Sequence, residues 1–209
     1  MLGIGPSAFT RYGATPPAPP TDVLAGLTPT LTVPAGGISP SAGEFGGTSY
    51  LSTNVVLSGT AILPLSPPDG TLFKLGGNMI CAYLGVRDHG ATFRVRTGDG
   101  GLAYSASSFD TVILDIPISS LPFDGKPHVI TWDFRITPGR ARLWIDNVFR
   151  GENFTTGGGG LKSGTWSGGG NGQWLIGGRS NINGEPTADW PTTVGASGLT
   201  LYADQLVSF

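Results

Sequence analysis

The chain has 209 residues, a length that suits one domain of sandwich or barrel size. Its 35 glycines and 17 prolines disfavour helix interiors, while 39% hydrophobic residues are too many for a disordered chain, so a turn-rich all-β protein is predicted. Charged residues make up only 12%, the net charge is −2, and the lysines and arginines are scattered, which gives no sign of a basic face for nucleic acid.

Residues 1–20 do not follow the pattern of a folded domain. Their apolar residues keep neither a helical nor a strand period: Leu2, Ile4, Phe9 and Tyr12. The prolines of segment 16–20 favour extended polyproline II. A solvated tail has no need of these apolar side chains, so we predict an extended N-terminal arm that docks on another subunit and makes the protein an oligomer. The alternative is a mobile tail.

The N-terminus lacks the basic start and long apolar run of a signal peptide. No apolar stretch reaches the ~18 residues that span a bilayer, so no membrane insertion is expected. Cys81 is the only cysteine, which excludes an intramolecular disulfide and predicts a small buried side chain.

Residues 21–209 are predicted to form the folded domain. Short apolar runs there alternate with Gly, Pro, Asn and Asp, as in antiparallel sandwiches and barrels. The predicted strands or strand-rich pieces are 28–37, 49–65, 70–77, 79–86, 91–101, 111–118, 129–136, 141–149, 173–178 and 198–209. No stretch of a dozen residues has a convincing helical period.

Residues 123–151 predict a three-stranded meander. Ile130, Trp132 and Phe134 alternate with polar or smaller residues and fall on one face of a strand. A second strand follows residues 137–139, and Asp146-Asn147 suits a two-residue hairpin turn because both types tolerate positive φ.

This block resembles the laminin-G-like, concanavalin-A-like jelly rolls. The residues that carry the resemblance are Asp124, Gly125, His128, Ile130, Trp132, Arg142, Leu143, Ile145 and Asp146, with Asn147 where the family usually has glycine. The resemblance spans about residues 45–209, although only 123–151 is specific. It implies a two-sheet antiparallel jelly-roll sandwich with loops at its rims, and a structural hydrogen bond for His128. Members of the family bind glycans or proteins, some through calcium, and others are structural modules.

Catalysis is not expected. Related jelly-roll glucanases carry paired glutamates on one strand, but Glu44, Glu152 and Glu185 are isolated among loop-forming residues. The G-x-S-x-G nucleophile motif is also missing from the sequence. We therefore predict that the chain is not an enzyme.

No cofactor is predicted. One cysteine and two distant histidines make a zinc site improbable. Calcium stays open, with loop carboxylates of Asp88, Asp99 or Asp189 as candidate ligands, but no EF-type loop or dense Asp cluster supports it.

Residues 155–174 form a glycine-rich stretch without the spacing of a phosphate-binding loop. A flexible rim loop is one interpretation. The other places Trp166 and Trp190 at the rim as stacking platforms for sugars, with Asn171 and Asn181 as polar partners. Core packing of these tryptophans is an equal alternative.

Three hypotheses for function follow. The first is a structural bacteriophage or virus particle protein on the virion surface, such as a capsid decoration, fibre or tail subunit, attached through the arm and able to touch host glycans. The second is a free carbohydrate-binding lectin module. The third is a glycosidase remnant. The apolar arm, the low charge and the lack of catalytic residues favour the first.

Overall fold

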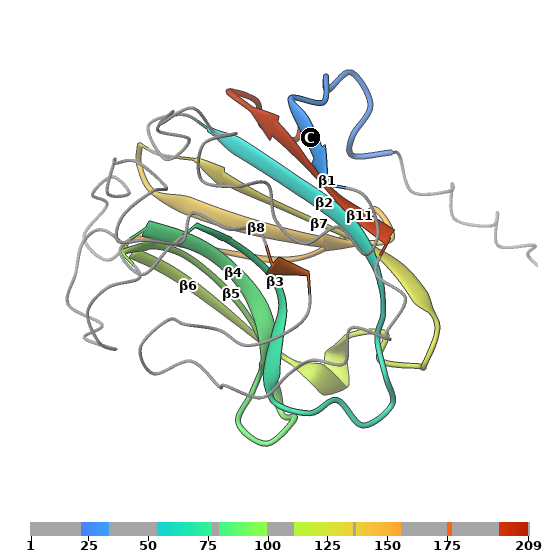
Figure 1. Cartoon of the computed structure of the whole chain (residues 1–209). Helices are drawn as coiled ribbons and strands as arrows, with labels where there is room; N and C mark the ends of the chain where they lie inside the picture. The colour runs from blue at the N-terminus through green and yellow to red at the C-terminus, as the bar shows by residue number, and fades with distance from the viewer. Residues whose placement is uncertain are drawn as a thin grey trace, which may run out of the picture.

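The computed structural model describes residues 22–33, 54–76, 80–99, 111–135, 137–155, 175–176 and 197–208. In these residues two antiparallel β-sheets lie face to face (Figure 1). The predicted all-β, antiparallel sandwich is therefore confirmed.

The first sheet has six strands in the order β1-β11-β2-β7-β8-β9. Their bounds are β1 Leu31–Val33, β11 Ser197–Ala203, β2 Val55–Ile62, β7 Pro127–Arg135, β8 Arg140–Ile145 and β9 Val148–Phe154. Every neighbouring pair is antiparallel. The C-terminal β11 therefore lies between the N-terminal β1 and β2.

The second sheet has five strands in the order β10-β3-β4-β5-β6. Their bounds are β10 Leu175–Ile176, β3 Gly70–Gly76, β4 Ile80–Arg87, β5 Thr92–Asp99 and β6 Thr111–Pro117, and a short 3₁₀ helix η2 (Ile118–Ser120) follows β6. Each strand of both sheets overlaps one of the predicted apolar runs. Within the described ranges, no helix is long and apolar enough to cross a membrane.

The hydrophobic core fills the space between the two sheets. Side chains of alternate strand positions meet there, and the largest include Trp132, Phe134 and Phe93, all at 0% exposure. Phe93 also packs edge-on against Phe123, with 5.7 Å between ring centroids. Because burying each such side chain stabilises the fold by about 1.5–3 kcal/mol, this layer holds the sheets together.

The meander of β7, β8 and β9 has the predicted faces. Ile130 pairs with Ile145 and Trp132 with Leu143, and all four side chains lie in the core. The turn between β8 and β9 has φ of 53° at Asp146 and 63° at Asn147, the left-handed conformation that the residue types predict. The three strands are thus correctly anticipated by alternation and turn chemistry.

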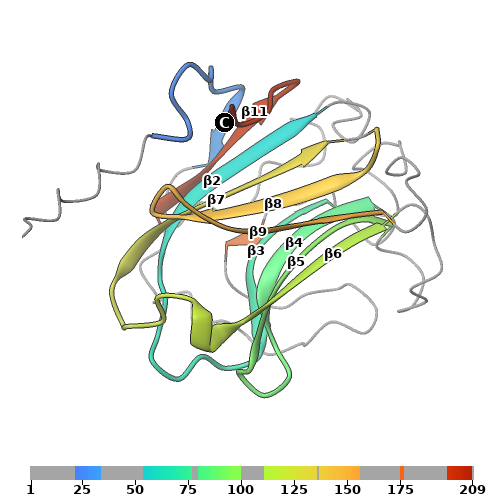
Figure 2. The ribbon, with the colours of Figure 1, turned by 180° about the vertical axis from the view of Figure 1, so that it is seen from behind.

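One side of the sandwich is closed where the edge strands β9 and β6 meet (Figure 2). The side-chain amide of Asn153 in β9 donates to the carbonyl oxygen of Ile113 in β6 at 2.7 Å. A Cβ on Gly151 would lie 3.5 Å from side-chain atoms of Leu114 and Ile116, so β9 packs directly on β6. This contact covers part of an edge that could otherwise pair with another chain.

The turn between β4 and β5 holds His89, which is exposed. The carboxylate of Asp69 accepts hydrogen bonds from the backbone N–H groups of His89 and Gly90. Gly90 has a φ of 81°, and a Cβ there would lie 2.7 Å from the carbonyl oxygen of Pro67. Only glycine therefore fits this position without a shift of the backbone.

The outer face of the six-stranded sheet is partly covered. A second apolar cluster lies there, formed by Val56, Trp144, Tyr202 and Val207. Segment 22–27 packs against it through half-buried apolar side chains. The sheet thus has a covered region on its outer face, beside which the candidate site lies.

Candidate functional site

A hollow of about 300 Å³ lies on the outer face of the six-stranded sheet, over β11, β2 and β7. Its described lining consists of Leu24, Ser58, Gly59, Thr60, Val129, Thr200 and Tyr202. The volume is at the lower end of the range for small-molecule sites in proteins. We call this feature the outer hollow.

Strand alternation and register bring these side chains together. On β2, Leu57 points into the core, so Ser58 and Thr60 lie on the opposite, outer face. Ser58 pairs with Thr200 of β11, and Thr60 pairs with Val129 of β7. Three neighbouring strands therefore present small polar and apolar side chains on one surface.

Hydroxyl groups dominate the polar part of this surface. Ser58 Oγ and Thr131 Oγ1 lie 2.9 Å apart, and Thr32 Oγ1 and Thr200 Oγ1 lie 3.3 Å apart. Ser58 and Thr131 are only 6% and 1% exposed, but Thr200 is half-buried, and because a hydroxyl has one donor and two acceptor lone pairs, its single contact leaves it able to bind a further group. The surface can therefore offer both donors and acceptors to a ligand.

Tyr202 forms the border between the outer hollow and the covered cluster. Its side chain belongs to both, and the residue is only 8% exposed. Burial, and then the negative charge of Asp22, raise the pKa of Tyr202, so its phenol stays protonated at neutral pH. Leu24, whose backbone N–H donates to the Asp22 carboxylate at 3.0 Å, lies on the same side.

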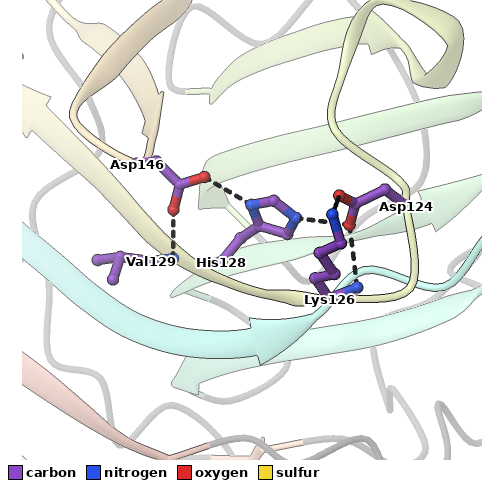
Figure 3. Close-up of polar contacts among 5 residues, drawn as sticks. All are labelled: Asp124, Lys126, His128, Val129 and Asp146. Atoms are coloured by element: carbon purple, nitrogen blue, oxygen red, sulfur yellow. Dashed lines mark hydrogen bonds and ion pairs between the residues drawn. The ribbon is translucent and has the colours of Figure 1, made fainter.

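Val129, which is 39% exposed, is held in place by Asp146. The backbone N–H of Val129 donates to Asp146 Oδ1 at 2.9 Å, and the backbone N–H of Asp146 donates to the Val129 carbonyl at 2.8 Å. The second carboxylate oxygen of Asp146 lies 2.5 Å from Nδ1 of His128 (Figure 3). The hairpin turn is thereby tied to the start of β7, next to the outer hollow.

His128 lies between two carboxylates, one on each ring nitrogen (Figure 3). Its Nε2 is 3.0 Å from Asp124 Oδ1, and the residue is 9% exposed. Burial alone would lower the pKa of His128, but the hydrogen bonds to Asp124 and Asp146 outweigh it and raise the pKa. Both nitrogens face acceptors, so the charged imidazolium is the form that fits this geometry.

The pKa of Asp124 is shifted in the opposite direction to that of His128. The hydrogen bond from His128, followed by one from the backbone N–H of Lys126 at 2.9 Å, lowers the pKa of Asp124 to about 2. The Lys126 ammonium lies 3.5 Å from the same carboxylate. The ion pair between Asp124 and His128 therefore links the loop before β7 to that strand.

The contacts of His128 with Asp124 and Asp146 have the geometry of a structural link and not that of a metal site. The two carboxylates bind opposite sides of the imidazole ring, so their oxygens do not converge on one point (Figure 3). Within the described ranges, no group of three or more His, Cys, Asp or Glu residues is placed to hold a metal. The hydrogen bonds of His128 agree with the structural role that the family resemblance implies for it.

Beneath the covered cluster lies a buried ion pair. Arg142, 2% exposed, donates from Nε to Asp133 Oδ1 at 2.9 Å and from Nη2 to the other carboxylate oxygen. Its Nη2 also donates to the Val207 carbonyl at 2.8 Å, and the Val207 N–H donates back to Asp133 at 3.2 Å. The guanidinium carbon lies 4.8 Å from the Trp144 ring centroid. These contacts fasten the C-terminal segment onto the sheet.

Most residues singled out from the sequence lie outside the described ranges. These are the predicted sugar contacts Trp166, Asn171, Asn181 and Trp190, the arm residues Leu2, Ile4, Phe9 and Tyr12, and Asp189. Asp99 lies in β5 and Cys81 in β4, with only their backbone described. Asp88 is exposed, with a φ of 58° in the turn beside His89. The interpretations attached to these positions stay predictions.

The outer hollow was not anticipated from the sequence. Its signal is weak, because Ser58 and Thr60 are two polar positions with strand spacing inside an otherwise apolar run. Such spacing indicates which face they share. It does not indicate that Thr200, more than a hundred residues away, would lie beside them.

Comparison with known proteins gives likeness in structure only. No protein-family model matches the chain, and no curated protein matches it. The CBM40 domain of Ruminococcus gnavus IT-sialidase, solved bound to alpha2,3 sialyllactose, aligns over 87% of this chain and 95% of its own, with 9% identity and a TM-score of 0.55. The leech intramolecular trans-sialidase aligns over 80% of this chain and 24% of its own, with 11% identity and a TM-score of 0.51.

A laminin domain pair gives a weaker match. Domains LG4-5 of the mouse laminin alpha1 chain align over 84% of this chain and 39% of their own, with 12% identity and a TM-score of 0.41, too distant to support an argument. The CBM40 match and the strand order agree on the fold. The chain is an antiparallel two-sheet jelly-roll sandwich, as its sequence predicts.

Proposed function

We propose that this chain is a non-catalytic glycan-binding module and that the outer hollow is its sugar site. The observation that carries the proposal is the hollow itself, a space of about 300 Å³ in which hydroxyl groups and apolar side chains meet on three neighbouring strands. The likeness of the fold to a CBM40 domain that binds sialyllactose is a secondary support.

The chemistry of the lining suits a sugar ring. A pyranose has hydroxyl groups around its edge and patches of C–H on its faces. The hydroxyls of Ser58, Thr60 and Thr200 would exchange hydrogen bonds with the edge, while Leu24 and Val129 would contact the C–H patches. A site this small and open is expected to bind one or two sugar units weakly, so display of several copies would raise avidity.

Binding is favoured over hydrolysis by the lining groups. Glycosidases flank the scissile bond with two carboxyl groups about 5–9.5 Å apart. The described residues that line the outer hollow contribute hydroxyl, methyl and phenol groups, with no carboxylate among them. We therefore propose recognition of an intact glycan.

The test is a glycan array probed with the full chain, followed by titration of the best hits by calorimetry. Thr60→Tyr fills the hollow and is expected to reduce affinity by at least about tenfold, because the ligand would be displaced. Thr60→Val removes only the hydroxyl and is expected to cost about three- to tenfold. Thr92→Val, at a half-buried threonine in the other sheet, is the matched control and should bind normally.

A rival location for the sugar is the predicted pair Trp166 and Trp190. If Trp166→Ala or Trp190→Ala abolishes binding while Thr60→Tyr leaves it unchanged, glycan recognition stands but the outer hollow is not its site. If the array is empty for the wild-type chain, the proposed function is wrong.

An assembly role in a virus or bacteriophage particle is a second proposal, supported by the sequence of residues 1–20. Its apolar side chains beside a proline-rich spacer favour docking on another subunit. Light scattering of the full chain and of a chain starting at Thr21 tests it: oligomers that become monomers without the arm support assembly through residues 1–20. A full chain that stays monomeric contradicts self-assembly.

A further inference from the structure

The described lining of the outer hollow carries no charged side chain. Its polar groups are the hydroxyls of Ser58, Thr60, Thr200 and Tyr202, and the rest of its side-chain surface is apolar. A ligand that fits this lining has to satisfy neutral donors and acceptors. A charged ligand group would lose part of its hydration here without meeting an opposite charge in the described lining.

Two carboxylates lie next to the hollow, and one of them, Asp146, is paired with the charged His128. Asp22 holds the turn that carries Leu24, and its charge also contributes to the raised pKa of Tyr202. Asp146 binds the backbone N–H of Val129 on the other side of the hollow. Carboxylates therefore lie close to both the Tyr202 side and the Val129 side.

Three described cations on this side of the sheet, Arg142, Lys126 and His128, are already paired with carboxylates. Arg142 is 2% exposed and binds Asp133 and the Val207 carbonyl beneath the covered cluster. The Lys126 ammonium lies 3.5 Å from the Asp124 carboxylate, in the loop before β7. Recognition of a carboxylate normally uses an arginine or lysine aimed at it, and the described lining supplies neither.

We propose that the outer hollow selects neutral saccharides and discriminates against sugars that carry a carboxylate. This inference rests on the proposed function, since it names the ligand class of the same site. It separates the chain from the structurally similar CBM40 domain, whose ligand, alpha2,3 sialyllactose, carries a carboxylate. Likeness of fold therefore does not transfer the ligand.

The experiment compares matched ligand pairs on the full chain. Each neutral glycan that binds is titrated beside the same glycan capped with sialic acid or with its terminal sugar oxidised to a uronic acid. Lactose and alpha2,3 sialyllactose form one such pair. The expected result is at least about tenfold weaker binding of the carboxylated member, because a partly desolvated charge is left unpaired.

Two variants test the electrostatic cause. Asp22→Asn keeps the oxygen that accepts from Leu24 but removes the charge, so binding of the carboxylated member is expected to rise about two- to threefold while neutral binding is unchanged. Thr60→Lys places a cation in the hollow and is expected to reverse the preference. Thr92→Lys, in the other sheet, is the control for a general change in net charge.

The outcomes separate the two proposals. Equal or tighter binding of the carboxylated member, lost in Thr60→Tyr, overturns the neutral preference and leaves glycan recognition at this site intact. Binding of neutral glycans that Thr60→Tyr does not change overturns the assignment to the outer hollow. An absence of binding to every glycan, neutral or carboxylated, overturns the proposed function and this inference with it.

Discussion

Two regions of one sheet face differ in what covers them. In the covered cluster, Val56 and Trp144 are 0% and 2% exposed because segment 22–27 and Val207 pack over them. In the outer hollow, which shares strand β2 with the cluster, Thr60 is half-buried, and Val129 on β7 is 39% exposed. Tyr202 lies at the boundary and contacts both regions.

The difference follows from the residue types on the outer face. Val56 and Trp144 are large apolar groups, and leaving them in water would be unfavourable by about 1.5–3 kcal/mol each, so they require a cover. Thr60 is small and polar and can remain solvated without such a penalty, while the buried hydroxyl of Ser58 pairs with that of Thr131. The sheet therefore lies under both regions, but only the outer hollow leaves space for a ligand.

The largest expected effect comes from breaking the ion pair under the covered cluster. Asp133→Ala would leave the buried guanidinium of Arg142 without its carboxylate and would remove an acceptor from the Val207 N–H. A loss of about 3–5 kcal/mol in the free energy of unfolding is expected, measured by urea denaturation.

The control for that experiment is the double variant Asp133→Leu with Arg142→Met. Replacing both charges by apolar groups removes the unpaired buried charge, so most of the lost stability should return. A loss below about 1 kcal/mol in Asp133→Ala would show that water or another group compensates the arginine, and that the covered region is not sealed.

A matched pair on β2 tests the comparison directly. Val56→Ala removes two buried methyl groups under the cover and is expected to cost about 1.5–2.5 kcal/mol of unfolding free energy. Thr60→Ala, four positions along the same face, should change stability by no more than about 0.5 kcal/mol. Equal losses in the two variants would mean that both regions are packed alike.

The sequence predicted the sandwich because its signals are local. Alternation along β7 identifies the core face of Ile130 and Trp132, and the turn preference of Asp146-Asn147 fixes how β8 and β9 pair. Such patterns need no knowledge of distant segments. They locate the strands and their buried faces but not the order of the strands in the sheets.

The outer hollow could not be predicted in the same way. It exists because β11 lies beside β2, which brings Thr200 next to Ser58 and Tyr202 next to Val56, and because Leu24 lines it as well. These contacts join residues near both ends of the chain. The functional residues chosen from the sequence were aromatic and amide groups in glycine-rich stretches, where composition is unusual, rather than common hydroxyl residues on strands.

His128 ties the hairpin turn beside the hollow by charge, which makes that tie depend on pH. Its pKa is raised above the ordinary 6.5, so its contribution to folding is fully present below pH 6.5 and is lost as the pH rises through the higher folded-state pKa. The pKa of Asp124 is lowered from 3.8 to about 2, so its contribution is present above pH 3.8 and is lost as the pH falls toward 2.

His128→Gln is therefore expected to be most destabilising between about pH 4 and 6.5, by roughly 0.5–1 kcal/mol, since both carboxylates are partly exposed to water. Urea denaturation of wild type and variant at pH 5.5 and pH 9 measures the difference, which should shrink at the higher pH. A difference that does not change with pH would mean that the histidine acts through packing alone.

The smallest expected effect concerns the link between that turn and the cover. The backbone N–H of Val23 donates to the side-chain oxygen of Asn147 at 3.2 Å, and this bond joins segment 22–27 to the hairpin. Asn147→Gly removes the acceptor, while glycine adopts the positive φ of 63° without strain. About 0.5 kcal/mol of unfolding free energy should therefore be lost. Hydrogen exchange should become faster at the Val23 amide while exchange in the core strand β7 is unchanged.

Faster exchange throughout β7 would instead mean that the substitution disturbed the turn and not segment 22–27. The covered cluster and the outer hollow would then be less independent than their burial indicates.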